Sequence, residues 1–308
     1  MTTSAAESVP VWTAWLTRVR VVLATAAVWA GLHYLAGGHV LPPGLDRPLV
    51  LAGAPHGLAA GLLVVGVLWI GAAVACLLGG VGDGRRPLMI LGAALALWAC
   101  EGGTRGGTMD AWLLLCHERP GPPTSAPYWR LLPDYLCYLV AIGGAAVISA
   151  LFAGHGGRGA ALRQTFGGEA SGRVSAAGPL ALLVTTLVTG VAVFFLTGPP
   201  EGATLRGQVY FAVGLGSIAG VYAARKLVKT SSPIWYWPAP FLVGIVGLVG
   251  AALNPALMLP PAYRQLDTIP AWGLARPLPV EMVGVGLLAC LWMLRGEAAE
   301  PTVTASHA

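Results

Sequence analysis

The sequence predicts an all-α integral membrane protein, a bundle of about eight transmembrane helices with both termini in the cytoplasm. Three observations predict it. Of the 308 residues, 56% are hydrophobic and only 10% are charged, whereas soluble globular proteins carry about 25% charged residues. Apolar stretches long enough to cross a bilayer recur along the whole chain. Basic residues gather in alternate connections between these stretches, as the positive-inside rule requires.

The spans are predicted from apolar length, since a membrane helix needs about 20 mostly apolar residues. The stretches that qualify are 18–37, 57–79, 87–102, 134–153, 178–197, 207–228, 237–258 and 279–295. The third is short if it ends at Gly102, and the eighth contains Glu281 near its start. The first resembles a signal peptide, but no small-residue cleavage site follows it, which favours a retained helix.

The Lys and Arg residues in the connections orient these spans. Eleven flank one side: Arg18, Arg20, Arg85, Arg86, Arg158, Arg163, Arg173, Arg225, Lys226, Lys229 and Arg295. Six flank the other: Arg47, Arg119, Arg130, Arg206, Arg264 and Arg276. The richer side is predicted to be cytoplasmic. We therefore expect a cytoplasmic N-terminal segment at 1–17, one transmembrane domain at 18–295 and a disordered cytoplasmic tail at 296–308, in a bacterial cytoplasmic (inner) membrane.

Several functional classes lack their usual signals. No basic run exceeds a few residues, so the net charge of +5 does not indicate a nucleic-acid surface. The five Cys show no CxxC spacing, which zinc and thioredoxin-type sites use. No motif indicates a bound cofactor. No internal repeat indicates an inverted-repeat transporter. The lipid bilayer is the one partner that the composition requires.

The segment 98–110 is the most unusual part of the chain. Glu101 lies about 20 Å along a hydrocarbon core about 30 Å thick if the third helix begins near residue 87. A charge at that depth costs on the order of 2.5–3.5 kcal/mol, so it should be paired, protonated or hydrated. Arg105 follows four residues later, but Gly102, Gly103, Gly106 and Gly107 make an unbroken helix unfavourable. The sequence therefore predicts a glycine-broken third helix, with Thr108 capping a short helix from Met109 to Cys116.

Two interpretations of this segment remain open. In the first, Glu101 and Arg105 form the floor of a polar pocket that opens to the outside, with Asp110, His117 and Asp134 at its rim. In the second, the third helix ends at Gly102, an interfacial helix follows, and Glu101 merely pairs with Arg105.

Other polar groups give weaker hypotheses. Imidazoles can bind transition metals, and His33, His56 and His117 all map to the outer half, where solvated histidines are also common. Cys116 and Cys137 could form a disulfide on an oxidising outer side, or pack as free thiols. The basic residues Arg225, Lys226 and Lys229 either anchor the cytoplasmic side or bind anionic lipid headgroups.

Three short stretches resemble motifs of intramembrane enzymes. Glu101-x-x-x-Arg105 resembles the Glu-Glu-x-x-x-Arg motif of the CAAX-processing protease family, but Cys100 replaces its first Glu and the later His motifs are missing. Residues 99–105 resemble the exosortase nucleophile region, without its later Asn-x-x-Arg signature. Residues 214–217 resemble a rhomboid serine motif, without its downstream His. No family is assigned on these stretches.

Three functions fit the sequence. The first is an enzyme or binding protein whose outward-facing polar site around the third helix binds or acts on a small molecule or ion. The second is a non-catalytic subunit or scaffold of a larger membrane complex, because small-residue faces at 57–61 and at Gly214, Gly216 and Gly220 favour close helix contact with partner subunits. The third is a transporter or channel, because broken helices bind ions near the membrane midplane.

Overall fold

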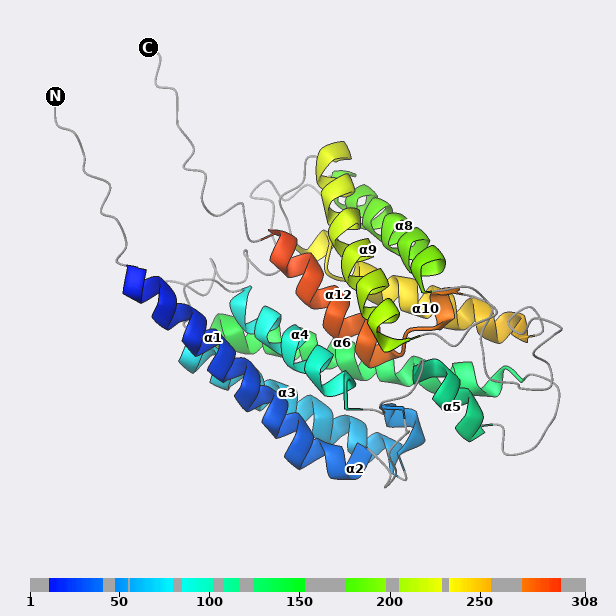
Figure 1. Cartoon of the computed structure of the whole chain (residues 1–308), viewed down its shortest axis with the longest axis horizontal. Helices are drawn as coiled ribbons and strands as arrows, with labels where there is room; N and C mark the ends of the chain where they lie inside the picture. Colours follow the sequence, from blue (N-terminus) through cyan, green and yellow to red (C-terminus); the bar gives the residue numbers. More distant parts are fainter. Residues whose placement is uncertain are drawn as a thin grey trace, which may run out of the picture.

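The chain folds as a helical membrane bundle (Figure 1). The computed structural model describes residues 11–40, 48–54, 56–79, 85–101, 108–116, 124–152, 176–197, 205–228, 233–255 and 273–294. Every regular element among these residues is a helix. Within them, 6 helices are long and apolar enough to cross a membrane: Trp12–Val40, Gly57–Gly79, Ala126–Phe152, Ala177–Leu196, Arg206–Leu227 and Pro233–Leu253. Two shorter apolar helices, Arg86–Ala99 and Pro279–Met293, accompany them.

Four of the predicted spans agree with helices of the structure to within two residues. They are α3 (Gly57–Gly79), α8 (Ala177–Leu196), α9 (Arg206–Leu227) and α12 (Pro279–Met293). In these segments the apolar run and the helix have the same ends, so counting apolar residues is enough to find them.

Two helices begin earlier than predicted. α1 (Val11–Gly31) starts seven residues before residue 18, and it continues through a π-helix at Leu32–Gly37 into α2 (Gly38–Val40). α6 (Ala126–Phe152) starts eight residues before residue 134. The added turns carry Trp, Tyr and Arg side chains, which suit the membrane interface but lower the apolar count from which the spans were predicted.

Two helices end earlier than predicted. α4 (Arg86–Ala99) stops three residues before Gly102. α10 (Ala239–Leu253) stops five residues before residue 258, and a 3-10 turn at Pro233–Trp235 precedes it. Asn254 ends α10 with φ −140° and ψ 65°, outside the helical region, just before a proline, which disfavours helical backbone in the preceding residue.

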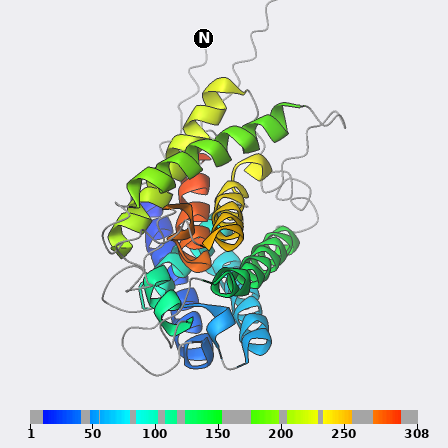
Figure 2. The same ribbon diagram turned by 90° about the vertical axis from the view of Figure 1, so that its right-hand side faces the viewer.

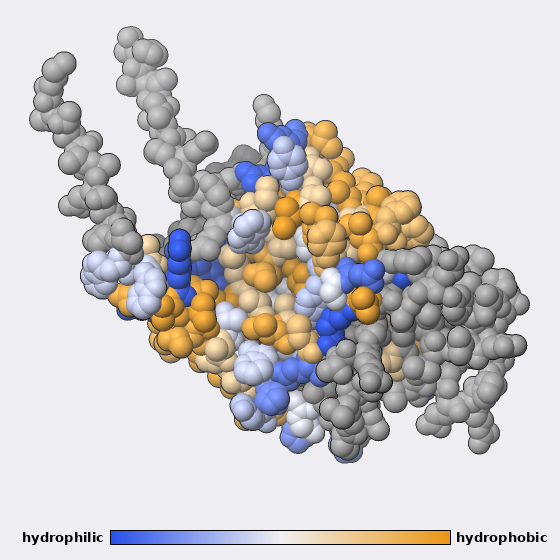
Figure 3. Space-filling view, viewed as in Figure 1, coloured by the Kyte–Doolittle hydropathy of each residue, from blue (hydrophilic) through white to orange (hydrophobic). Residues whose placement is uncertain are grey.

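The short helices α4 and α12 pack against each other at the centre of the bundle. α12 also contacts α6, α9 and α10, while α4 contacts α1, α3 and α6. Both views place the α8–α9 pair on the opposite side of α12 from α1 and α3 (Figures 1 and 2). Long helices thus surround two short ones, and the exposed large hydrophobic side chains lie mainly on the long ones. Figure 3 shows one such hydrophobic surface over α8 and α9.

Successive helices run up and down, so the bundle has two ends. Arg85 and Arg225 both contact the last turn of α12, which defines the Arg225 end. His33 contacts Glu101 at the opposite end, which we call the Glu101 end. The first turn of α1 and the last turn of α12 lie toward the same end (Figure 1).

Glycines allow the central pair to approach at backbone distance. A Cβ added at Gly92 of α4 would lie 3.0 Å from the backbone nitrogen of Leu288 and 3.2 Å from the carbonyl oxygen of Gly284, both in α12. A Cβ at Gly284 would in turn lie 2.7 Å from the backbone nitrogen of Ala96. No flexible side chain stands between the two helices at these points, so only glycine fits.

The small-residue faces noted in the sequence form contacts between helices of the same chain. Gly216 and Gly220 of α9 lie against Thr189 and Thr185 of α8, and Thr189 donates a hydrogen bond to the carbonyl oxygen of Gly216 (3.2 Å). Gly61 of α3 faces the sulfur of Cys137 in α6. These faces hold neighbouring helices of one chain together.

We predict that Gly92→Val lowers the free energy of unfolding by about 1–3 kcal/mol, because its side chain would collide with the backbone of α12. The measurement is the temperature at which the buried thiols of Cys76 and Cys290 react with a fluorogenic maleimide in detergent. Gly66→Val is the matched control, because a Cβ there meets no atom within 4 Å. If the thiols of the two variants react at the same temperature, Gly92 does not lie against the backbone of α12.

Candidate functional site

The site is built around the point where α4 ends. After Ala99 the chain closes in a tight turn, in which the N–H groups of Cys100 and Glu101 donate to Leu97 (3.1 Å) and Trp98 (3.0 Å). The 14 residues of α4 span about 21 Å, less than a hydrocarbon core of about 30 Å. α4 is thus shorter than the 6 helices that are long enough to cross a membrane.

The predicted break of the third helix falls partly outside the described residues. Arg105 and the glycines from Gly102 to Gly107 lie there. On the far side of that stretch, α5 (Thr108–Cys116) begins at Thr108. The predicted short helix from Met109 to Cys116 is therefore confirmed to within one residue, and α4 and α5 are separate helices.

Glu101 pairs with His33 of the first membrane helix. The imidazole Nδ1 lies 2.7 Å from the carboxylate Oε2. The His33 side chain is 42% exposed and that of Glu101 18%, so this pair can meet solvent. Trp29 stacks on the imidazole with ring centroids 5.5 Å apart, and Tyr34 meets it edge-on. Because Nδ1 faces the carboxylate, Nε2 is the ring nitrogen left for another molecule.

The second carboxylate oxygen of Glu101, Oε1, is buried and has no hydrogen-bond partner among the described residues. A buried acceptor of this kind normally has a donor, whether from protein, water or a ligand. Arg105, which one interpretation of the sequence pairs with Glu101, lies outside the described residues. Among the described residues, the Glu101 carboxylate pairs with a residue that is 68 positions away in the chain.

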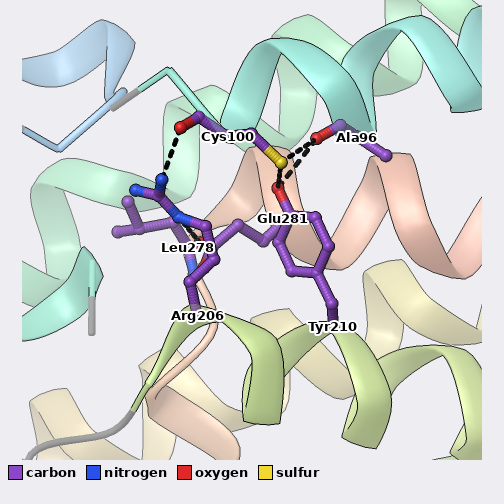
Figure 4. A network of polar contacts seen from close by, with 6 residues as sticks. All are labelled: Ala96, Cys100, Arg206, Tyr210, Leu278 and Glu281. Atoms are coloured by element: carbon purple, nitrogen blue, oxygen red, sulfur yellow. Dashed lines mark hydrogen bonds and ion pairs between the residues drawn. The ribbon is translucent and has the colours of Figure 1, made fainter. Parts of the chain in front are cut away.

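A second polar network lies on the other side of the α4 terminus (Figure 4). Arg206, the first residue of α9, donates from Nη1 to the carbonyl oxygen of Cys100 (2.6 Å). Its Nε lies 3.6 Å from Oε1 of Glu281, whose side chain is fully buried in the first turn of α12. Oε2 of Glu281 accepts the backbone N–H of Leu278 (2.9 Å).

Tyr210 completes this network. Its hydroxyl donates to the carbonyl oxygen of Ala96 (2.8 Å). The Cys100 sulfur lies 3.5 Å from the Tyr210 hydroxyl oxygen and 3.4 Å from the Ala96 carbonyl oxygen, and the Cys100 side chain is exposed. The exposed thiol of Cys100, which precedes Glu101 in the chain, therefore lies beside the phenol of Tyr210.

The charges of this network match the helix ends. The C-terminus of α4 carries partial negative charge, and the guanidinium of Arg206 sits on it. The N-terminus of α12 carries partial positive charge, and the carboxylate of Glu281 caps it. Because the two helices are antiparallel neighbours, one ion pair serves both ends. Sequence reasoning noted Arg206 and Glu281 separately, but it had no signal that would join them.

At the Arg225 end, two arginines cap the last turn of α12. Arg85 donates to the carbonyl oxygen of Leu294 (2.6 Å) and Arg225 to that of Met293 (3.3 Å). Lys226 lies over the ring of Tyr222, 5.7 Å from its centroid. Of the three residues proposed to bind lipid headgroups, Arg225 thus contacts a helix terminus, and Lys229 lies outside the described residues.

Asp134, which the sequence predicts at the rim of a pocket, is buried between α6 and the connection that precedes α3. Its side chain is only 2% exposed. Its two carboxylate oxygens accept the N–H groups of Leu51 (2.9 Å) and Ala52 (3.2 Å) at the start of the 3-10 turn Leu51–Gly53. Asp134 therefore ties the connection before α3 to α6.

The remaining candidates are only partly placed. His117 falls outside the described part of the chain, as does the side chain of Asp110. His56 is exposed. No group of three or more His, Cys, Asp or Glu among the described residues is arranged to hold a metal ion.

The cysteines are free thiols in the structure. All five, Cys76, Cys100, Cys116, Cys137 and Cys290, are unpaired with one another, so Cys116 and Cys137 are not joined here. Burial raises the pKa of the Cys116 thiol, and the nearby guanidinium of Arg130 partly opposes the increase. Cys116 is therefore a poor nucleophile at neutral pH.

Comparison with known proteins adds no relative. No family model, no curated protein and no solved structure matches the chain.

We predict that Asp134→Ala lowers the free energy of unfolding by about 1–3 kcal/mol for each backbone N–H that is left buried without an acceptor. Asp134→Asn, which keeps one carbonyl oxygen, should lose less. Thermal unfolding in detergent, followed by thiol reactivity, measures both. His56→Ala is the control, since that side chain is exposed near the same turn. If Asp134→Ala unfolds at the wild-type temperature, the carboxylate does not have this structural role.

Proposed function

We propose that this multi-pass membrane protein binds a small molecule or ion at the Glu101 end and exchanges a proton with it. His33 is the proton acceptor, and Glu101 orients the imidazole. One observation carries the proposal: a half-exposed imidazole whose Nδ1 lies 2.7 Å from a mostly buried carboxylate.

The chemistry of such a pair is well defined. A carboxylate that accepts the Nδ1–H bond fixes the imidazole tautomer and leaves the lone pair of Nε2 directed away from it. It also stabilises the imidazolium that forms when Nε2 takes a proton. The pair can therefore serve as a general base toward a bound molecule, or as a proton carrier for a bound ion.

The polar groups near the α4 terminus suit a small polar ligand. Tyr210 and Cys100 offer a phenol and an exposed thiol on the other side of the α4 terminus. Arg105, Asp110 and His117 belong to the proposed site from their sequence positions, with Arg105 as the partner of an anionic group. Asp134 is left out, because both of its oxygens bind backbone N–H groups.

The other two functions have less support. The small-residue faces that favoured a subunit or scaffold pack against helices of the same chain. A transporter or channel would need polar groups along a path to the Arg225 end, where the arginines Arg85 and Arg225 cap the last turn of α12.

We also propose that α4 and α12 cross the membrane, which gives eight spans with both termini in the cytoplasm of a bacterial cell. Their small length is acceptable because long helices surround them and replace lipid around them. The Arg225 end carries basic residues in the first half of α1, at the start of α4 and at the end of α9: Arg18, Arg20, Arg85, Arg86, Arg225 and Lys226. At the Glu101 end, Arg206 and Arg276 bind backbone carbonyl groups of Cys100 and Thr197.

We expect His33→Gln and Glu101→Gln to lower affinity for the ligand at least tenfold, and to abolish proton exchange on binding. Molecules that co-purify with the protein are first identified by absorption and mass spectrometry. The compound found is then titrated into wild type and variants in weak buffer that contains a pH dye.

The control for this experiment is His56→Gln, which removes an exposed imidazole at the same end of the bundle and should bind and exchange protons as wild type does. All variants should reach the membrane in equal amounts. Wild-type affinity and proton exchange in both His33→Gln and Glu101→Gln would refute the proposal.

A further inference from the structure

A crevice between α1 and α3 lies on a different helix face from His33, because its lining residues Gly31 and Leu35 are each two positions from that residue. It is lined only by glycine and aliphatic residues: Ala27, Val28 and Gly31 of α1, Leu35 of the π-helix that continues α1, and Val67, Ile70, Gly71 and Val74 of α3. Its volume is about 70 Å³ and it is partly open to the surroundings. A space with no polar lining does not hold water well. Its natural occupant at membrane depth is a hydrocarbon chain.

Gly31 and Gly71 shape the crevice. Gly31 has no side chain, and a Cβ there would lie 3.5 Å from Val67, which is an ordinary contact. Gly71 allows Val28 to approach it closely, since a Cβ at Gly71 would lie 3.0 Å from that side chain. The rim residues Leu35 and Ile70 are 57% and 66% exposed. The opening therefore faces the lipid side of the bundle.

A basic residue lies on the same helix face toward the Arg225 end. Arg20 precedes Ala27 by seven residues, which is two helical turns, so the two side chains share one face about 10.5 Å apart along the axis. Arg20 is exposed, as is Arg18, two residues earlier in the chain. Between Arg20 and the crevice the surface is apolar, with Leu23 on α1 and Leu77 on α3 exposed at 57% and 71%.

We propose that this α1–α3 face binds one anionic phospholipid, with its phosphate at Arg20 and one acyl chain in the crevice. The dimensions agree, because one leaflet of a core about 30 Å thick is about 15 Å deep, which takes a chain from the level of Arg20 into the crevice. The guanidinium can extend toward the interface while its stem lies along apolar surface. This site is separate from the His33–Glu101 pair and from the basic cluster at Arg225 and Lys226.

The test uses the purified full-length chain in mixed micelles with equal amounts of phosphatidylglycerol and phosphatidylcholine, and native mass spectrometry counts the retained lipids. Wild type should retain phosphatidylglycerol at least fivefold over phosphatidylcholine. Arg20→Gln should remove that preference, and Gly31→Leu should lower retention of both lipids at least fivefold.

The matched controls are Lys226→Gln, which removes a charge at the same end of the bundle, and Gly143→Leu, at a position where a Cβ meets no atom within 4 Å. Both should retain lipid as wild type does. Ala27→Leu fills the crevice from an exposed position and repeats the readout if Gly31→Leu unfolds.

Three outcomes would overturn the proposal. In the first, Arg20→Gln and both crevice variants retain lipid as wild type does. In the second, Lys226→Gln rather than Arg20→Gln removes the preference, which places the headgroup at the other basic cluster. In the third, the crevice variants convert a dimer to a monomer with unchanged lipid retention, which means that the crevice receives a helix of a second copy.

Discussion

Backbone groups at helix ends need hydrogen-bond partners, and the ends of the short helices α4 and α12 find them in charged side chains of the chain itself. The first turn of α12 is capped by its own Glu281, and the last turn of α4 by Arg206. At the opposite end, Arg85 and Arg225 cap the last turn of α12. The antiparallel pairing of the two helices, set by Gly92 and Gly284, lets a few charged side chains serve several ends at once.

The candidate site follows from the same arrangement. Because α4 stops after Ala99, Cys100 and Glu101 form the turn that follows it inside the bundle. Glu101 meets the imidazole of His33 from α1, and the carbonyl group of Cys100 meets Arg206 from α9. The place of these polar groups is therefore set by where α4 ends.

Sequence alone could predict what depends on local composition. Apolar length located α3, α8 and α9, and glycine content together with a capping threonine located the start of α5 to within one residue and the end of α4 to within three. It also marked Glu101 as a charge that needs a partner. It could not say which partner, because the pairing of His33 with Glu101 depends on how α1 packs against α4. For the same reason it assigned Asp134 to a pocket rim, although the carboxylate binds the backbone of a distant turn.

The central claim is that the α4 terminus lies within the membrane depth and is open to water on the outer side, and the exposed thiol of Cys100 reports on it directly. Cys116 and Cys137 are replaced by Ala, while the buried Cys76 and Cys290 are kept. Intact spheroplasts are then treated with a membrane-impermeant maleimide, with Lys226→Cys as the reference for the Arg225 end. The account predicts that Cys100 is labelled in intact spheroplasts and that Lys226→Cys is labelled only after permeabilisation. Labelling of Cys100 only after permeabilisation, or its protection in both conditions, would contradict it.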